Sequence, residues 1–213
     1  MTEVAPTLDE RALVVAVRAG DEAAFRRLIA EYGPAMLRVA RRHVSDHAIA
    51  EEVVQEAWLG VLRGLERFEG RSSLKTWVFR ILRNTAISRA EREGRTVPFS
   101  SLDGDGGDDH AVEESRFQAE GRWAGHWAAP PEAWSPEARL LDGETRGVVE
   151  RTIAELPRAQ AIVISLRDVE GFSPEEVCNV LEISESNQRV LLHRARSRVR
   201  AALEDHLGER PGP

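Results

Sequence analysis

The sequence is poor in several features that define whole classes of protein. Its 213 residues include a single cysteine, Cys178, which excludes an internal disulfide and any metal cluster built from cysteines alone. The purely apolar runs extend over only a few residues, far short of the roughly 20 that a membrane-spanning helix needs. The first residues, MTEVAPTLDE, lack the basic and apolar stretches of a secretory signal. We therefore expect a soluble protein that stays in the cytoplasm without membrane insertion.

Signatures of catalysis are missing as well. The chain contains no GxxxxGK[ST], GxSxG or HExxH motif. His43 and His47 have the i, i+4 spacing of a metal pair, but Ser45 and Asp46 are expected to end the helix between them. We therefore expect no enzyme, no metal and no cofactor.

The charge is unevenly distributed along the chain. The formal net charge is −7, from 29 basic and 36 acidic residues. Residues 96–145 hold eleven acidic and three basic residues, whereas residues 71–95 hold seven basic and two acidic ones. Residues 189–200 carry five arginines and no acid. Two basic patches thus flank an acidic middle, and because a polyanion responds to the local field, the net charge does not exclude nucleic acid as a partner.

Residues 8–95 are predicted to form a first helical domain. We expect helices over 8–19 and from 21 to 32, with Gly33-Pro34 interrupting the second one. The strongest helical pattern is the apolar stripe over residues 49–65, and a second such stripe begins at residue 74. Helices around this stripe would bury one compact core.

Residues 96–140 are predicted to be a linker. The run from Asp103 to Asp109 is acidic, rich in glycine and unable to bury apolar area. Trp123, Trp127 and Trp134 follow among prolines. They would pack either on this protein or on a partner, and both alternatives are open.

Residues 141–205 are predicted to form a second helical domain, followed by a flexible tail over 206–213. Ser173 to Glu176 reads as a capping box with proline at the first helical position. A tight turn over 182–184 and a helix from about 185 to 203 follow. A short helix, a turn and an arginine-bearing helix are the parts of a helix-turn-helix, whose second helix enters the major groove. The competing interpretation is a helical hairpin with a solvated basic face. The fold class is therefore all-α: two small helical domains joined by a long acidic linker.

Three groups of side chains are candidates for binding. On the last helix, four basic residues are expected off the buried stripe: Arg189, His193, Arg194 and Arg196. The basic patch of the first domain is interleaved with aromatic residues, as suits single-stranded nucleic acid. Within it Phe68 is the better stacking candidate, because Trp77 lies on the apolar stripe and is expected to pack inside. The polar edge of the strong helix carries four further residues, Glu51, Glu52, Gln55 and Glu56, which we interpret as a solvated or protein-docking face because no cleft desolvates them.

Two blocks of sequence resemble one known family. AEEVVQEAWL over 50–59 and FEGRSSLKTWVFRILRNTA over 68–86 are similar to region 2 of an extracytoplasmic-function (ECF) sigma factor of the sigma-70 family. LP at 156–157, LRDVEGFS over 166–173 and LHRAR over 192–196 resemble region 4 of the same family. The resemblance covers residues 21–95 and 145–203 in the same order and spacing.

The resemblance implies a bacterial initiation subunit, and it gives the candidate residues their expected roles. Its partners would be core RNA polymerase, through the beta-prime clamp helices and beta, promoter DNA as duplex and single strand, and an anti-sigma factor. The acidic face of Glu51, Glu52, Gln55 and Glu56 would dock on the polymerase. The minus-10 set combines the resemblance with the basic patch: Phe68, Arg71, Ser72, Lys75, Phe79, Arg80, Ile81, Arg83 and Asn84. The minus-35 set is Ser186, Gln188, Arg189, Val190, His193, Arg194 and Arg196.

The reading helix departs from the family pattern. Many members have Thr-Val-Lys/Arg-Ser-Arg-Leu where this chain has Asn187-Gln188-Arg189-Val190-Leu191-Leu192, so the minus-35 sequence is not predicted. Two rival hypotheses stand beside the sigma factor: a stand-alone helix-turn-helix regulator that binds duplex DNA by itself, and an adaptor that binds only proteins. We expect a monomer, because no long heptad seam is present.

Overall fold

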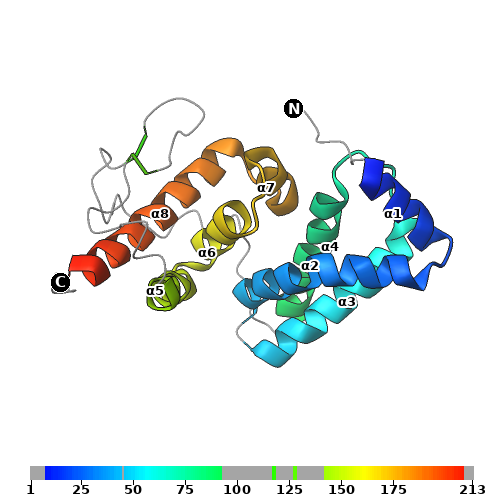
Figure 1. Ribbon diagram of the computed structural model, residues 1–213, viewed down its shortest axis with the longest axis horizontal. Helices are drawn as coiled ribbons and strands as arrows, with labels where there is room; N and C mark the ends of the chain where they lie inside the picture. The colour runs from blue at the N-terminus through cyan, green and yellow to red at the C-terminus, as the bar shows by residue number, and fades with distance from the viewer. Residues whose placement is uncertain (1–7, 45, 93–116, 119–126, 129–141, 209–213) are drawn as a thin grey trace. The chain divides into compact units, whose positions relative to one another are not determined.

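The computed structural model describes residues 8–44, 46–92, 117–118, 127–128 and 142–208. Over this part of the chain the structure consists of eight α-helices, a short π-helical segment and one isolated antiparallel bridge between Phe117 and Trp127 (Figure 1). The described residues form two compact units. The first contains those within 1–98 and 166–185, and the second contains those within 99–165 and 186–213. The predicted all-α fold with two helical units is confirmed over the described residues.

The first unit begins with α1 (Leu8–Arg18) and α2 (Glu22–His43), where Asp21 caps α2 by accepting hydrogen bonds from the backbone of Ala23 and Ala24. The predicted interruption at Gly33-Pro34 is wrong, because α2 continues with Pro34 inside it. Its buried face runs past the proline on both sides, from Leu28 to Met36 and beyond. Packing of this face offsets the backbone hydrogen bond that proline cannot donate.

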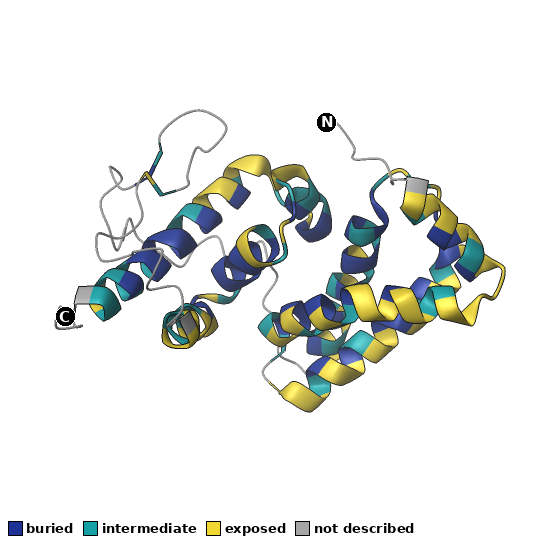
Figure 2. Cartoon of the chain, viewed as in Figure 1, coloured by how far each residue is buried: buried dark blue, intermediate teal, exposed yellow. Residues whose placement is uncertain are grey.

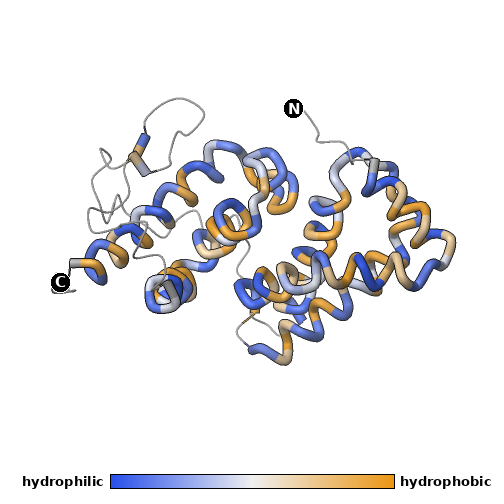
Figure 3. Tube along the Cα trace, in the orientation of Figure 1, coloured by the Kyte–Doolittle hydropathy of each residue, from blue (hydrophilic) through white to orange (hydrophobic). Residues whose placement is uncertain are grey.

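The core of the first unit lies between α2, α3 (His47–Leu65) and α4 (Leu74–Arg92), which contact one another pairwise. On the sides where these three helices face one another, the residues are buried (Figure 2) and mostly apolar (Figure 3). Two glycines of α3 permit a close approach of α4. A Cβ atom on Gly60 would lie 2.9 Å from Ile81 Cγ2, and one on Gly64 would lie 3.0 Å from Trp77 Cζ2. The α3–α4 spacing therefore depends on the absence of both side chains.

The helix α7 (Pro174–Leu181) also belongs to the first unit, although the sequence boundaries group it with 141–205. The predicted capping box is present: Ser173 Oγ accepts a hydrogen bond from Glu176 N, and Glu176 Oε2 accepts one from Ser173 N. Val177, Val180 and Leu181 are buried. Residues that are local in sequence fix where α7 begins, whereas its contacts with α4 are nonlocal.

The second unit contains α5 (Asp142–Glu155), α6 (Arg158–Ile164) and most of α8 (Glu185–Gly208). Every residue from 159 to 164 is buried, and α6 passes into the π-helical segment Ser165–Val169. On α8 the buried apolar stripe comprises Leu192, Ala195, Val199 and Leu203. No described helix is long and apolar enough to cross a membrane.

Candidate nucleic-acid interface

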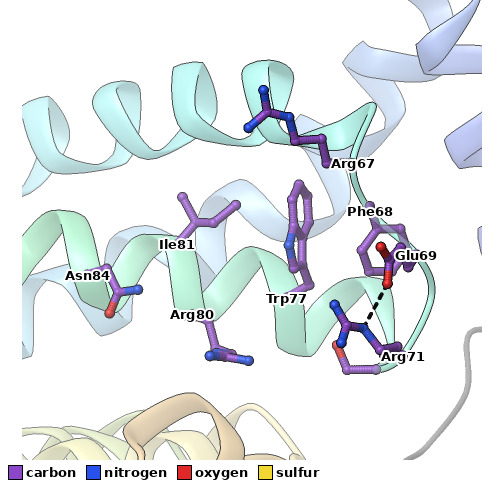
Figure 4. Close-up of a pocket in the computed structure, with 9 residues that line it drawn as sticks. Arg67, Phe68, Glu69, Arg71, Trp77, Arg80, Ile81 and Asn84 are labelled. Carbon is purple, nitrogen blue, oxygen red and sulfur yellow. Dashed lines mark ion pairs between the residues drawn. The ribbon is translucent and has the colours of Figure 1, made fainter.

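A pocket of about 590 Å³ opens where the α3–α4 loop meets α4 (Figure 4). Such a volume falls within the range of small-ligand sites. Its lining combines aromatic, cationic and amide side chains: Arg67, Phe68, Glu69, Arg71, Ser72, Trp77, Arg80, Ile81 and Asn84.

Two aromatic rings form the apolar part of this pocket. Phe68 packs on Trp77 with ring centroids 5.0 Å apart and planes tilted by 45°. Figure 4 shows Trp77 rising from α4 toward α3, between Phe68 and Ile81. The indole reaches this position because Gly64 on α3 has no side chain to exclude it. Because Phe68 is 9% exposed, the half-buried indole of Trp77 is the ring on which a planar base can stack, with Phe68 packed behind it.

The polar part of the pocket is predominantly cationic. Three arginines and one glutamate line it, and Glu69 is paired with Arg71 at 3.0 Å (dashed line in Figure 4). Asn84 adds an amide, whose oxygen accepts a hydrogen bond from Arg83 at 3.1 Å. Guanidinium groups bind phosphate, and an amide can pair with the edge of a base. Together with the rings, these groups suit an unstacked nucleotide.

The loop that carries Phe68 is held by contacts from both sides. Phe68 N donates to Leu65 O, and Gly70 turns the chain with a φ of 70°. Ser73 Oγ accepts a hydrogen bond from Thr76 N and so begins α4. From α1, Arg18 donates through Nε to Leu65 O at 3.0 Å and through Nη2 to Phe68 O at 2.5 Å. The loop is therefore positioned by α1 as well as by its own helices.

The structure divides the predicted minus-10 residues into two groups. Six line the pocket: Phe68, Arg71, Ser72, Arg80, Ile81 and Asn84. The other three, Lys75, Phe79 and Arg83, contact the 170–182 segment, and Phe79 is 1% exposed. Sequence reasoning missed Arg67, expected Trp77 inside the core and took Phe68 as the better stacking ring, whereas Phe68 is 9% exposed and Trp77 is half-buried. Trp77 does pack, on Phe68, and the exposed remainder of its ring faces the pocket.

The predicted acidic face of α3 is exposed, as all four of its residues, Glu51, Glu52, Gln55 and Glu56, have accessible side chains. Two of its carboxylates are paired with α4: Glu52 with Arg89 at 2.7 Å and Glu56 with Arg92 at 3.3 Å. Leu59 continues the same stripe one turn further and is 50% exposed. The face therefore combines exchangeable ion pairs with an apolar side chain.

The predicted minus-35 residues on α8 differ in accessibility. Ser186, Arg189 and Val190 are exposed, and His193 and Arg194 are partly so. The expectation that Arg196 lies off the buried stripe is wrong, since it is 4% exposed; Gln188 is 2% exposed. With 3.6 residues per turn, position 196 lies beside the buried Leu192 and Ala195 as well as beside the exposed face.

Linker residues also contact α8. The ring of Phe117 lies 4.4 Å from that of His193, and Arg200 lies 5.5 Å from the centroid of Trp127. The sequence left open whether the linker tryptophans pack on this protein or on a partner; Trp127 packs on this protein. Trp123 and Trp134 lie outside the described residues. Among the described residues, no group of three or more His, Cys, Asp or Glu could hold a metal ion.

Comparisons with known proteins identify two family regions, the second of which includes residues 166–185 of the first compact unit. Residues 28–96 match the family model of sigma-70 region 2, and residues 146–199 match that of sigma-70 region 4. The chain is 32% identical over 192 residues to an ECF RNA polymerase sigma-E factor of Escherichia coli, covering 90% of this chain and 93% of the relative. It is 30% identical over 204 residues to an RNA polymerase sigma-H factor of Pseudomonas aeruginosa, covering 94% and 96%.

Solved structures show the same fold. One is CnrH in complex with the cytosolic domain of CnrY, with a TM-score of 0.56, 21% identity and coverage of 92% of this chain and 97% of that chain. Another is the sigma factor RpoE in complex with the anti-sigma factor NepR from Bartonella quintana, with a TM-score of 0.55, 23% identity and coverage of 84% and 96%. With both family regions present in order and relatives matched over nearly their full length, this chain belongs to the ECF RNA polymerase sigma factors of the sigma-70 family.

Proposed function

We propose that this sigma factor opens its promoters by capturing one unstacked minus-10 base in the pocket between the α3–α4 loop and α4. The observation that carries the proposal is the combination of an aromatic surface, three arginines and Asn84 around about 590 Å³. Stacking on an aromatic side chain contributes about 1–3 kcal/mol per base. That gain is comparable to the few kcal/mol needed to unstack and unpair one base. Stacking together with the phosphate contacts of the three arginines would then offset the cost of opening, without nucleotide hydrolysis.

The exposed side of α3 is the proposed docking face for core polymerase, at the beta-prime clamp helices. Glu52 and Glu56 are already paired with Arg89 and Arg92, so basic residues of the polymerase would have to exchange with these partners. Such exchange costs little, because exposed ion pairs contribute only about 0–1 kcal/mol each. Leu59 would supply the apolar area that makes the contact favourable.

The exposed residues at the start of α8 are the proposed minus-35 readers. Arg189 and Arg194 can contact phosphates or guanine edges, and Val190, which is 47% exposed, can meet a thymine methyl group. Gln188 and Arg196 are buried, so we assign them to the support of the helix and not to the reading of bases.

The remaining expectations follow from the same role. We propose that the protein works in the bacterial cytoplasm, where its polymerase is, and that it acts by binding and not as an enzyme. Because a solved neighbour is a sigma factor in complex with an anti-sigma factor, we propose that an anti-sigma factor regulates this chain as well.

The experiment separates docking, reading and melting. The purified protein is combined with bacterial core polymerase, promoters are identified by run-off transcription from genomic DNA, and melted thymines are mapped with permanganate. Arg67→Ala and Asn84→Ala should keep co-elution with core polymerase and reduce permanganate reactivity about tenfold, as expected for about 1–2 kcal/mol of lost base contact. The matched control is Arg63→Ala, because Arg63 is exposed on α3 and lies outside the pocket.

A double variant tests the docking face. Glu52→Arg with Glu56→Arg should abolish co-elution with core polymerase. Unchanged melting in both pocket variants would overturn the base-capture proposal, and retained co-elution of the double variant would overturn the docking face.

A further inference from the structure

The 170–182 segment, which includes α7, packs against α4 through an aromatic contact. The rings of Phe172 and Phe79 meet edge to face with centroids 4.9 Å apart, and both side chains are fully buried. Lys75 Nζ lies 4.0 Å from the centroid of the Phe172 ring and donates a hydrogen bond to Glu170 O at 2.6 Å. Burial lowers the pKa of Lys75 despite the nearby carboxylates. Lys75, a residue of the predicted minus-10 set, is therefore partly shielded from solvent by this segment.

Three glutamates of the segment bind polar groups of α2 and α4. Glu170 receives two hydrogen bonds from Arg38, at 2.7 and 2.9 Å. Glu176 Oε1 accepts from Ser73 Oγ at 2.9 Å and from Thr76 Oγ1 at 3.0 Å, while its other oxygen completes the cap of α7. Glu182 pairs with Arg83 at 2.7 Å and with Arg80 at 3.4 Å.

The Glu182 contacts reach the edge of the pocket. Arg80 is itself a lining residue, and Arg83 donates to Asn84, another lining residue. The carboxylate of Glu182 thus holds two of the cations that a promoter phosphate would bind. A carboxylate and a phosphate compete for the same guanidinium groups, because both accept the same paired hydrogen bonds.

The backbone at Glu182 supports a role for its side chain. Glu182 ends α7 in the left-handed conformation, with a φ of 56°, and it is the only non-glycine residue with positive φ in the described part of the chain. Glycine is the usual residue at this position of a helix end, because it adopts that conformation without strain. A glutamate there is disfavoured locally, which is consistent with a contribution made through the ion pairs with Arg80 and Arg83.

We propose that the 170–182 segment is an intramolecular ligand of the promoter-binding face of α4, and that the free protein is held in a closed state by Glu170, Phe172, Glu176 and Glu182. We name these four residues the α7 clasp. Promoter DNA and the α7 clasp cannot occupy Lys75, Arg80 and Arg83 together, so opening precedes or accompanies minus-10 binding. The inference rests on the proposed role of α4 in binding the minus-10 strand.

When only the open state binds DNA, the apparent affinity is the intrinsic affinity multiplied by the fraction of open molecules. An ion pair between exposed side chains changes an equilibrium by roughly two- to fivefold. The Glu170–Arg38 pair, whose carboxylate is 6% exposed, changes it by at least as much. Loss of the Glu170 and Glu182 pairs together should therefore raise the affinity of the free protein for single-stranded DNA by about tenfold. The buried Phe172 contact remains in such a variant, so that the helices stay folded.

The test variant is Glu170→Gln with Glu182→Gln, and the matched control is Glu91→Gln with Glu155→Gln. Both variants remove two negative charges, but Glu91 and Glu155 are exposed and lie outside the clasp. A second test variant, Glu182→Gly, removes the same carboxylate and relieves the strain of the left-handed backbone. Because glycine favours this conformation, an effect of Glu182→Gly cannot be attributed to misfolding.

Two measurements on the free, full-length protein decide the proposal. Spin labels at Glu175→Cys on α7 and Arg63→Cys on α3, in a Cys178→Ser background, report the separation of the two helices by pulsed electron resonance. We expect one narrow distance distribution in the parent and the control, and a broadened one in both test variants. Binding of a fluorescein-labelled, mixed-sequence single-stranded 20-mer should tighten about tenfold in the double test variant relative to the control.

A broad distribution in the parent, or a narrow one that neither test variant changes, would overturn the clasp. This readout requires neither polymerase nor promoter, so it can fail while the sigma-factor assays succeed. If the distances respond as expected but single-stranded DNA binds the test variant and the control equally, the competition between clasp and DNA is refuted.

Discussion

Arg18 of α1 is expected to position the minus-10 pocket, although it lies before the residues that match sigma-70 region 2. Its guanidinium spans Leu65 O, at the end of α3, and Phe68 O, in the loop that forms one wall of the pocket. Arg18→Ala removes both hydrogen bonds; Leu65 O keeps the bond from Phe68 N, whereas Phe68 O loses the donor from α1. Arg18→Lys keeps the charge but cannot reproduce the fork that reaches both acceptors.

The expected magnitude follows from the exposure of the site. Hydrogen bonds to charged groups contribute about 1.5–3 kcal/mol each when removed. Arg18 is exposed, so water can replace its contacts, and we expect the Arg18→Ala variant to lose about 1–2 kcal/mol of unfolding free energy in total. Displacement of Phe68 should weaken minus-10 melting several-fold, while co-elution with core polymerase through α3 stays intact.

Urea unfolding and permanganate mapping with the holoenzyme measure the two effects. Arg11→Ala is the matched control, since Arg11 is an exposed arginine of the same helix and is not among the groups that hold the loop. Arg18→Lys should fall between the parent and Arg18→Ala. If Arg18→Ala unfolds and melts promoters as Arg11→Ala does, the loop does not depend on α1 and the reasoning is refuted.

Two further predictions concern packing and titration. Gly64→Ala should gain up to about 1 kcal/mol of helix propensity but lose about 1–3 kcal/mol by crowding the Trp77 ring; a lower urea midpoint and shifted tryptophan emission would show the net loss. Burial raises the pKa of Glu176, but hydrogen bonds from Ser173, Ser73 and Thr76 outweigh it and hold that pKa below the ordinary 4.5. Its stabilisation is therefore complete above pH 4.5 and lost as the pH falls through the lowered value, so the stability difference between the parent and Glu176→Gln should vanish in acid.

Local patterns predicted the helices well. The apolar stripe over 49–65 corresponds to α3, and the capping box at Ser173 begins α7 as expected. The error at Gly33-Pro34 has a clear cause. Glycine followed by proline indicates only a local backbone preference for ending a helix. The burial of Leu28 and Met36, on either side of Pro34, is a tertiary packing interaction that outweighs this preference.

Only part of the candidate site could be predicted from local sequence patterns. Phe68, Arg80 and Asn84 follow from resemblance and spacing, and all three line the pocket. The contribution of Trp77 could not be read from periodicity, because a residue on the buried stripe can still present one edge to solvent. That edge is available only because Gly64 on the neighbouring helix lets the indole lie across α3.

The contacts of α7 show most clearly that hydrophobic periodicity does not predict nonlocal hydrogen bonds. Glu176 reads in the sequence as a capping residue, and one of its oxygens does cap α7, but the other binds Ser73 and Thr76, about a hundred positions earlier in the chain. A carboxylate has enough acceptor sites for both tasks. The same side chain therefore specifies where a helix begins and where that helix docks. Because Ser73 also begins α4 through its bond to Thr76, the start of the proposed DNA-binding helix and the start of the clasp helix share one hydrogen-bonded cluster. We therefore expect a substitution at Ser73 or Glu176 to disturb the start of both helices, as the proposed link between promoter binding and release of α7 requires.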